Sequence, residues 1–407
     1  MKSAAERLAA SRQPVSRLRL WMAVLLGSLS AFGPLSIDMY LPSLPQLAGD
    51  FAADTSMAQL SLTACMLGIS FGQLLVGPLS DVHGRKKPLL IGLVLYAIAS
   101  ILCVVSPSIE TFVLMRFLQG LGGAAGIVIS RAIVRDMYEG AEMTKFFSLL
   151  MLVNGVAPIA APIAGGQILQ WTSWRGVFFV LAVIGLLMLL AVVFGLKETL
   201  KEHNRSKGGI GNTLRTFRGL LGDRVFMGYA MTQGMVVAAM FAYISGSPFV
   251  LQGIYGVSPQ MYSVFFAING LGIIIASQVA GRLAGRVSAT KLLLAGLGMA
   301  SIGGIALLIM IIADAGGLYG LLIPLFFVVS SVGIVQTASF SLAMEKQGKS
   351  AGSASALIGL LSFIFGGCMA PLVGLGGSGT ALPMGIVIAS VNVIAVLCYA
   401  ILVRRIR

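Results

Sequence analysis

The sequence predicts an all-α integral membrane protein in which twelve transmembrane helices form two six-helix bundles, with both termini in the cytoplasm. Three observations predict this fold class. Hydrophobic residues make up 57% of the 407 residues and charged residues only 10%, whereas soluble domains are about one-quarter charged. Apolar runs of about 20 residues, enough to cross the hydrocarbon core as a helix, recur along the whole chain. Basic residues lie almost entirely on one side of these runs.

Each predicted span is an apolar run bounded by polar residues or by a loop. The first follows a basic tail, but it is too long for a signal peptide and no cleavage site follows it. In chain order the predicted spans are 20–41, 57–79, 88–106, 109–130, 146–168, 176–196, 224–247, 261–281, 290–313, 317–341, 352–373 and 381–403.

The connections between spans are short except for one polar stretch in the middle of the chain. The predicted organisation is therefore an N-terminal tail (1–19), a first bundle (20–196), a central loop (197–223), a second bundle (224–403) and a basic tail (404–407).

The distribution of basic residues predicts the orientation. Of the 28 Lys and Arg residues, all but Arg116 and Arg175 lie in the tails or in alternate loops. By the positive-inside rule, these segments are cytoplasmic. The topology accounts for the net charge of +14, so no nucleic-acid partner is expected. The alternative left open is that the tail or the central loop binds anionic lipid.

The residues that hold metals or perform nucleophilic chemistry are scarce. The two His residues lie in separate loops, and the four Cys residues are scattered through the spans without CxxC spacing. We therefore expect no metal, no cofactor and no enzymatic activity.

The two predicted bundles share a weak internal repeat. A shift of 204 residues aligns Gly77, Leu79, Lys87, Leu89, Leu90, Gly92 and Leu93 with Gly281, Leu283, Lys291, Leu293, Leu294, Gly296 and Leu297. Parallel repeats of helical bundles are typical of transporters that bind substrate between the halves near the middle of the membrane.

Several motifs resemble a known family. The segment GPLSDVHGRKKP (77–88) resembles the signature loop of the major facilitator superfamily, as does LxRxxQG (114–120). GVAPIAAPIAGG (155–166) is similar to the signature of its drug:proton antiporters. IDMYLPSLP (37–45), RAIVRD (131–136) and AYISGSPF (242–249) look like the bicyclomycin and chloramphenicol resistance (Bcr/CflA) branch.

The resemblance spans nearly the whole chain. It implies a monomeric exporter in the bacterial cytoplasmic (inner) membrane that exchanges small amphiphilic drugs, such as chloramphenicol- or bicyclomycin-like compounds, for protons. One departure is that Val82 replaces the usual basic residue after the loop aspartate, and another is that Gly285 replaces the aspartate in the second-half copy.

Asp38 and Arg116 are the candidates for proton coupling. Asp38 is the only acidic residue well inside an apolar span, where an unpaired charge costs several kcal/mol. Arg116 is the only basic residue deep in a span, and the resemblance implies that it lines the central cavity. The alternatives are that Asp38 merely lies at the outer mouth of the first span, and that Arg116 is a fixed ion pair or carbonyl clamp.

A cytoplasmic gate is expected where the second span turns into the third, close to the end of the fourth. Ion pairs there, for example between Arg85 and Asp136, would hold the cytoplasmic side closed in the outward-facing state. The alternative is an ordinary solvated basic loop. The candidate gate residues are Gly77, Asp81, Gly84, Arg85, Arg131, Arg135 and Asp136.

Two further sets of residues have expected roles. Gly155, Pro158, Pro162, Gly165 and Gly166 form the antiporter motif of the fifth span and should bend it and allow close helix packing. Polar residues on apolar spans are candidates for the substrate cavity, although each is individually as well explained by helix packing: Tyr40, Gln119, Asn154, Tyr243, Ser247 and Asn269.

Two other functions remain open. The first is export of an endogenous metabolite, such as an amino acid or a sugar, by the same fold. The second is a channel or a non-transporting scaffold, against which the buried charges and the gate-like loop count.

Overall fold

The computed structural model describes residues 17–205, 217–345, 347 and 351–404. This described part is helical, with only an isolated bridge between Ala284 and Val287. Twelve of its helices are long and apolar enough to cross a membrane, which confirms the predicted all-α, twelve-span fold, while the cytoplasmic orientation of the termini stays a prediction. Most of the N-terminal tail, the middle of the central loop and the last three residues lie outside the described residues.

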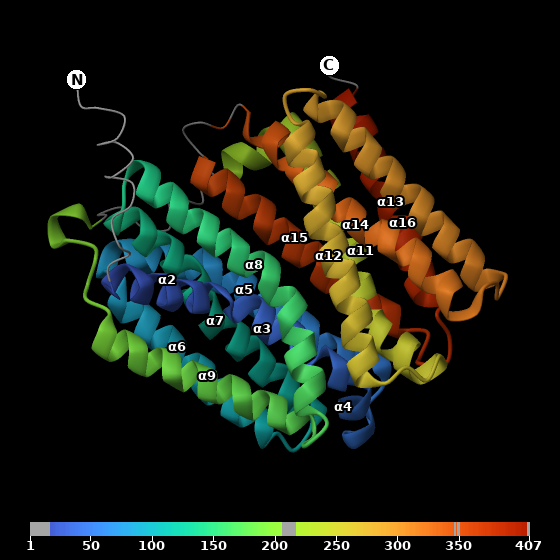
Figure 1. The fold of residues 1–407 in the computed structure, drawn as a ribbon, viewed down its shortest axis with the longest axis horizontal. Helices are drawn as coiled ribbons and strands as arrows, with labels where there is room; N and C mark the ends of the chain where they lie inside the picture. Colours follow the sequence, from blue (N-terminus) through green and yellow to red (C-terminus); the bar gives the residue numbers. More distant parts are fainter. Residues whose placement is uncertain (1–16, 206–216, 346, 348–350, 405–407) are drawn as a thin grey trace, which may run out of the picture.

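The helices pack as two groups (Figure 1), which are named the N-half and the C-half. The N-half comprises α2 (Arg17–Ser30), α3 (Phe32–Asp38), η1 (Leu41–Ser43), α4 (Leu44–Asp50), α5 (Thr55–His83), α6 (Lys86–Val104), α7 (Ile109–Met137), α8 (Gly140–Ile168) and α9 (Trp174–Gly195). The short η2 (Glu202–Asn204) lies in the linker. The C-half comprises α11 (Arg224–Pro248), η3 (Phe249–Ile254), α12 (Pro259–Leu283), α13 (Ala289–Ile312), α14 (Gly317–Met344), α15 (Ala351–Gly374), α16 (Leu382–Cys398) and η4 (Tyr399–Arg404).

Close helix contacts in each half depend on small residues. In the N-half, α7 packs against both α5 and α6, and in the C-half α11 packs against α14, α15 and α16. A Cβ at Gly122 of α7 would lie 2.6 Å from the carbonyl oxygen of Gly92 on α6. Glycine is therefore needed there, because the two backbones approach more closely than a side chain permits.

The first predicted span is not one continuous helix. Helix α2 ends at Ser30, and α3 begins at Phe32. Pro34 explains the break, because it has no N–H to donate to the carbonyl of Ser30. After Asp38 the chain continues through η1 and α4 to Asp50, well beyond the predicted end at 41. The seventh span is also longer than predicted, because a π-helix carries it past Pro248 to Ile254.

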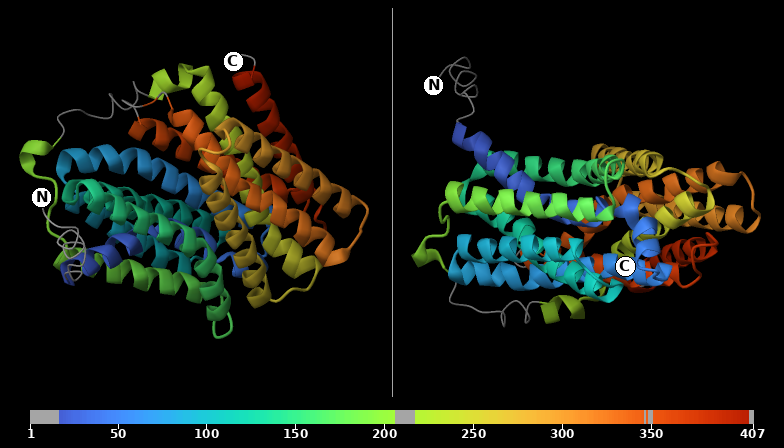
Figure 2. Two further views of the ribbon diagram at one scale, coloured as in Figure 1. Left: turned by 45° about the horizontal axis from the view of Figure 1, so that its top comes forward. Right: turned by 90° about the horizontal axis from the view of Figure 1, so that it is seen from below.

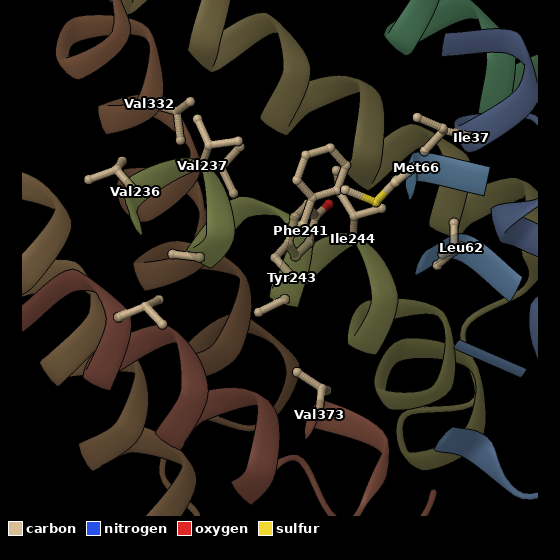
Figure 3. Close-up of a cluster of buried hydrophobic side chains, with 14 of the residues drawn as sticks. Ile37, Leu62, Met66, Val236, Val237, Phe241, Tyr243, Ile244, Val332 and Val373 are labelled. Carbon is tan, nitrogen blue, oxygen red and sulfur yellow. The ribbon is translucent and has the colours of Figure 1, made fainter. Parts of the chain in front are cut away.

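The two halves meet mainly at one end of the molecule. We call the end at which α2 begins and η4 finishes the termini end, and the other the opposite end (Figure 2). Helix α5 packs against α15, and α8 against α12. In the shared core, Met66 of α5 lies beside Phe241 and Ile244 of α11 (Figure 3).

Hydrogen bonds across the halves lie toward the opposite end. Gln59 Nε2 donates to the Ser245 carbonyl at 2.9 Å, and Thr63 Oγ1 to the Gly367 carbonyl at 2.7 Å. The Gly367 carbonyl is available because Pro371, four residues later, has no N–H. This conformation is therefore closed at the opposite end.

We expect Gly374→Ala to weaken this closure. A Cβ at Gly374 would lie 2.5 Å from Gln59 Oε1 and from Ser56 Cα, and overpacking of this kind costs about 1–3 kcal/mol. With spin labels at Thr172 and Ser378, electron–electron distance measurements should reveal a new population with longer distances. Gly359→Ala on the same helix is the matched control, because nothing lies within 4 Å of its Cβ position. Identical distributions in both variants would contradict the prediction.

Candidate transport site and gate

Asp38 is the last residue of α3 and is only 6% exposed. Among the described residues, its carboxyl group has no hydrogen bond and no ion pair. It lies within electrostatic reach of Tyr243 and Tyr262, which belong to the C-half. The end of a helix is also an unfavourable place for a negative charge, because the last carbonyls point there. Asp38 is thus a buried acid that faces the other half of the molecule.

Arg116 is fully buried on α7, and its side chain binds a backbone carbonyl of the first span. Its Nη2 donates to the Ser36 carbonyl at 2.7 Å, and its Nη1 donates to Gln119 Oε1. The guanidinium also lies 4.4 Å from the ring centre of Tyr40. The structure therefore places Arg116 as a clamp on α3, two residues before Asp38, without an ion pair to the Asp38 carboxylate.

The clamp belongs to a larger network of buried polar groups in the N-half. Gln119 Nε2 donates to Ser100 Oγ at 2.8 Å, and the Tyr40 hydroxyl lies 2.9 Å from Ser61 Oγ. The hydroxyls of Ser36 and Tyr96 are 3.0 Å apart. Tyr40 and Gln119, two of the residues predicted to line the cavity, are therefore engaged inside the N-half in this conformation.

A second polar group lies in the C-half, opposite Asp38. Asn269 Nδ2 donates to the Tyr243 hydroxyl at 2.9 Å, and the hydroxyls of Ser247 and Tyr262 are 3.3 Å apart. The Tyr243 ring stacks on Phe266. These side chains are all buried, so three of the predicted cavity residues are brought together with Asp38 where the halves meet.

Asn154 is separate from this group. Its Nδ2 donates to Ser30 Oγ at 2.6 Å and to the Leu150 carbonyl at 2.7 Å. Asn154 therefore ties α8 to the end of α2, within the N-half.

The antiporter motif on α8 touches both the first span and the C-half. A Cβ at Gly165 would overlap the carbonyl oxygen of Met39, the residue after Asp38. A Cβ at Gly166 would lie 2.7 Å from Ser263 Oγ of α12, and this hydroxyl donates to the Pro162 carbonyl at 2.7 Å. Pro158 lies one turn earlier in the same helix. The motif thus connects the Asp38 segment with the contact between the halves.

The predicted gate contains a partly buried ion-pair cluster at the termini end. Arg85 Nε donates to Asp136 Oδ2 at 2.7 Å, and Arg85 Nη1 donates to Asp81 Oδ1 at 2.5 Å and to Ser80 Oγ at 2.9 Å. Burial alone would lower the pKa of Arg85, but the hydrogen bonds to Asp136 and Asp81 outweigh it and raise the pKa. All these groups belong to the N-half.

The other predicted gate residues contribute differently. Arg131 and Arg135 make no hydrogen bond or ion pair to this cluster among the described residues, and Arg135 is exposed. A Cβ at Gly77 would lie 3.9 Å from Val128 Cγ1, which is an ordinary packing distance. The backbone conformation requires glycine at position 84, because the φ of +87° is unfavourable for other residues.

Glu198, just after α9, completes the cluster and was missed by the sequence analysis. Its carboxylate accepts hydrogen bonds from the backbone N–H groups of Arg85 at 2.8 Å and Lys86 at 3.1 Å, at the start of α6. The neighbouring Thr199 Oγ1 donates to Asp136 Oδ2 at 3.2 Å. An acid followed by a hydroxyl residue directly after an apolar span was the available signal. Partial burial raises the pKa of Glu198, but the backbone hydrogen bonds outweigh it and lower the pKa.

Glu198→Gln should reduce stability in a pH-dependent way. Because the folded pKa lies below the unfolded value of about 4.3, the charged form stabilises the fold above that value, and this contribution is lost as the pH falls through the folded pKa. A cap of this kind contributes about 0.5–1 kcal/mol at a partly exposed site. Thermal unfolding in detergent at pH 7 should show the loss, and the difference from the wild type should shrink in acid. Glu202→Gln, which alters an exposed linker acid, should have no such effect; a loss of equal size at every pH would contradict this account.

Gly165→Ala should destabilise the protein, because the added methyl group displaces the backbone at Met39. Overpacking against a backbone atom costs about 1–3 kcal/mol. Gly155→Ala on the same helix is the control, since its Cβ would meet only Ile274 at 3.9 Å. Thermal unfolding should separate the two variants, and equal melting temperatures would show that the Met39 contact is not tight.

Comparison with known proteins agrees with this architecture. A family model described as Major Facilitator Superfamily matches residues 24–371. The chain is 49% identical over 388 residues to an uncharacterized MFS-type transporter, YdgK, of Bacillus subtilis, covering 95% of this chain and 96% of that protein. It is 33% identical over 380 residues to a bicyclomycin resistance protein homolog of Haemophilus influenzae, covering 93% and 95%.

Solved structures share the fold at low sequence identity. A bacterial homolog of the human lysosomal transporter Spinster, in an inward-facing and occupied conformation, aligns with a TM-score of 0.75 and 15% identity over 96% of this chain and 98% of that one. The xylose transporter XylE from E. coli, in a partially occluded inward open conformation, aligns with a TM-score of 0.72 and 14% identity over 94% and 97%. Because the family model covers most of the chain and its relatives are transporters, the chain belongs to the major facilitator superfamily and is a multi-pass membrane transporter rather than an enzyme.

Proposed function

We propose that this transporter exports small amphiphilic drugs from the bacterial cytoplasm in exchange for protons, by alternating access in the cytoplasmic membrane. The relative named for bicyclomycin resistance and shorter matches to multidrug resistance proteins MdtL support the substrate class. The observation that carries the proposal is Asp38, a buried acid between the halves without a cationic partner.

Closure at the opposite end depends on the charge of Asp38, because this carboxyl group is buried between the closed halves. An ionised carboxylate that is buried and unpaired costs several kcal/mol, and Arg116 is committed to the Ser36 carbonyl. The closed conformation therefore favours the protonated, neutral acid. When the opposite end opens, water reaches Asp38 and can hydrate the carboxyl group in either its charged or its neutral form.

The positive-inside distribution assigns the termini end to the cytoplasm. The described conformation is then closed toward the outside with a proton on Asp38. Release of this proton to the cytoplasm, together with entry of substrate between the halves, would destabilise the closed outer end and favour the outward-facing state. Proton uptake from outside would restore the described conformation.

The gate cluster is proposed to act in the outward-facing state. Arg85, Asp136 and Glu198 fix the turn between α5 and α6 as a rigid surface. A rigid turn can receive the C-half repeatedly in one position when the termini end closes. The Arg85 guanidinium is already paired with Asp81 and Asp136 inside the N-half, so contact with the C-half need not supply a partner for it.

The residues facing Asp38 favour neutral or weakly charged substrates. Tyr243, Ser247 and Asn269 offer hydroxyl and amide groups beside the Phe266 ring, and no second buried cation accompanies them among the described residues. Strongly anionic solutes would call for clustered Arg or Lys. One proton crossing about 150 mV supplies roughly 3.5 kcal/mol, enough for a gradient of a few hundredfold.

Asp38→Asn should abolish drug-dependent proton release, because the amide cannot exchange a proton. The measurement is fluorescence dequenching in acidified inverted vesicles, to which chloramphenicol-like and bicyclomycin-like compounds are added. Asp314→Asn is the matched control, since Asp314 is exposed at the opposite end. Release that persists in Asp38→Asn would remove Asp38 from the mechanism. If no drug acts on the wild type but an amino acid or sugar does, the substrate is a metabolite.

A further inference from the structure

A groove runs along the outer face of the N-half and is not part of the site described above. It has a volume of about 640 Å³ and lies between the first span, α8 and α9. Its floor is formed by Ala23, Gly27 and Ala31, and its walls include Val153 of α8 and Leu187 of α9. Helix α2 passes between α8 and α9 (Figure 1).

The groove exists because its floor lacks large side chains. Ala23, Gly27 and Ala31 recur every four residues, so they share one face of the helix. In membranes such a stripe usually receives a neighbouring helix. Helices α8 and α9 both contact α2 but make few contacts with each other, and all residues that line the groove belong to the first span, α8 and α9.

The length of the groove fits an acyl chain. Within α2 its lining residues run from Leu20 to Ser28, a rise of about 12 Å at 1.5 Å per residue, and the lining continues past the break to Leu35 of α3. One leaflet contributes about half of the 30 Å hydrocarbon core, so the groove covers the leaflet at the termini end. Its residues belong to candidate membrane spans, where the surrounding solvent is lipid.

An exposed lysine lies near the termini end of each wall of the groove, close in sequence to an acid, Glu142 on α8 and Glu198 after α9. Lys145 is exposed and lies one turn before Leu149, which lines the groove, on the same face of α8. Exposed Lys197 follows the end of α9, where a Cβ at Gly195 would lie 2.8 Å from the Trp21 ring. Tryptophan is typical of the headgroup level, so both lysines lie where a lipid phosphate would be.

We propose that this groove binds an anionic phospholipid, with one acyl chain on the Ala23–Gly27–Ala31 floor and the phosphate between Lys145 and Lys197. The bound chain completes the packing of α2 between α8 and α9. The proposal does not depend on the substrate or on proton coupling.

The test is native mass spectrometry of the whole protein, purified with a mixture of phosphatidylglycerol and phosphatidylethanolamine. The wild type should retain phosphatidylglycerol preferentially. The double variant Lys145→Gln/Lys197→Gln should lose this preference, with retention falling on the order of tenfold. Ala23→Phe, which fills the groove, should retain neither lipid.

Two controls match these changes in the C-half. Arg282→Gln/Lys291→Gln removes two exposed cations, and Ile302→Phe enlarges a residue that is 72% exposed in its span. Both should retain phosphatidylglycerol as the wild type does. The proposal is overturned if the double lysine variant keeps the preference, if phosphatidylethanolamine is retained equally by the wild type, or if Ala23→Phe binds as the wild type does.

Discussion

The burial of the Arg116 guanidinium is the constraint on which much of the N-half depends. Arginine stays charged in proteins, so its surroundings must supply acceptors. The break after α3 provides one, because the last carbonyls of a helix have no partner within it, and the Ser36 carbonyl is among them. Gln119 accepts a second hydrogen bond and the guanidinium lies over the Tyr40 ring, while Nε has no hydrogen-bond partner among the described residues. The position of α3, and therefore of Asp38 at its end, follows from how this one charge is accommodated.

The two halves divide the chemistry unequally. Among the described residues, the buried charged side chains are Asp38, Arg85 and Arg116 of the N-half, whereas the C-half presents hydroxyl and amide groups at the contact. Across the contact, side chains donate to backbone carbonyls that helix ends or prolines leave available, as Gln252 Nε2 does to the Pro42 carbonyl at 3.0 Å. Each such bond contributes only about 0.5–1.5 kcal/mol, so the contact can be made and broken without a large barrier in any single step.

The sequence predicted most of the fold, because a helix in lipid must satisfy its own backbone and therefore needs a long apolar run. It also predicted that Arg85 and Asp136 would meet. Other features depended on three-dimensional detail. Asp38 faces Tyr243 rather than Arg116 because of where α3 ends, which hydropathy does not reveal, although Pro34 was a clue. Glu198 caps a helix far from it in sequence, and only the packing of α9 against α6 brings the two together.

Gly165 has a consequence for how such a transporter changes over generations. Its contact with Met39 joins two backbones, so almost any substitution disturbs it, whatever compound is carried. Tyr243, Ser247 and Asn269 make their contacts through side chains on the other half, not through backbone atoms. Under the proposed function, selection by new compounds can therefore change the C-half side chains that face Asp38 while the backbone contact beside Asp38 stays fixed.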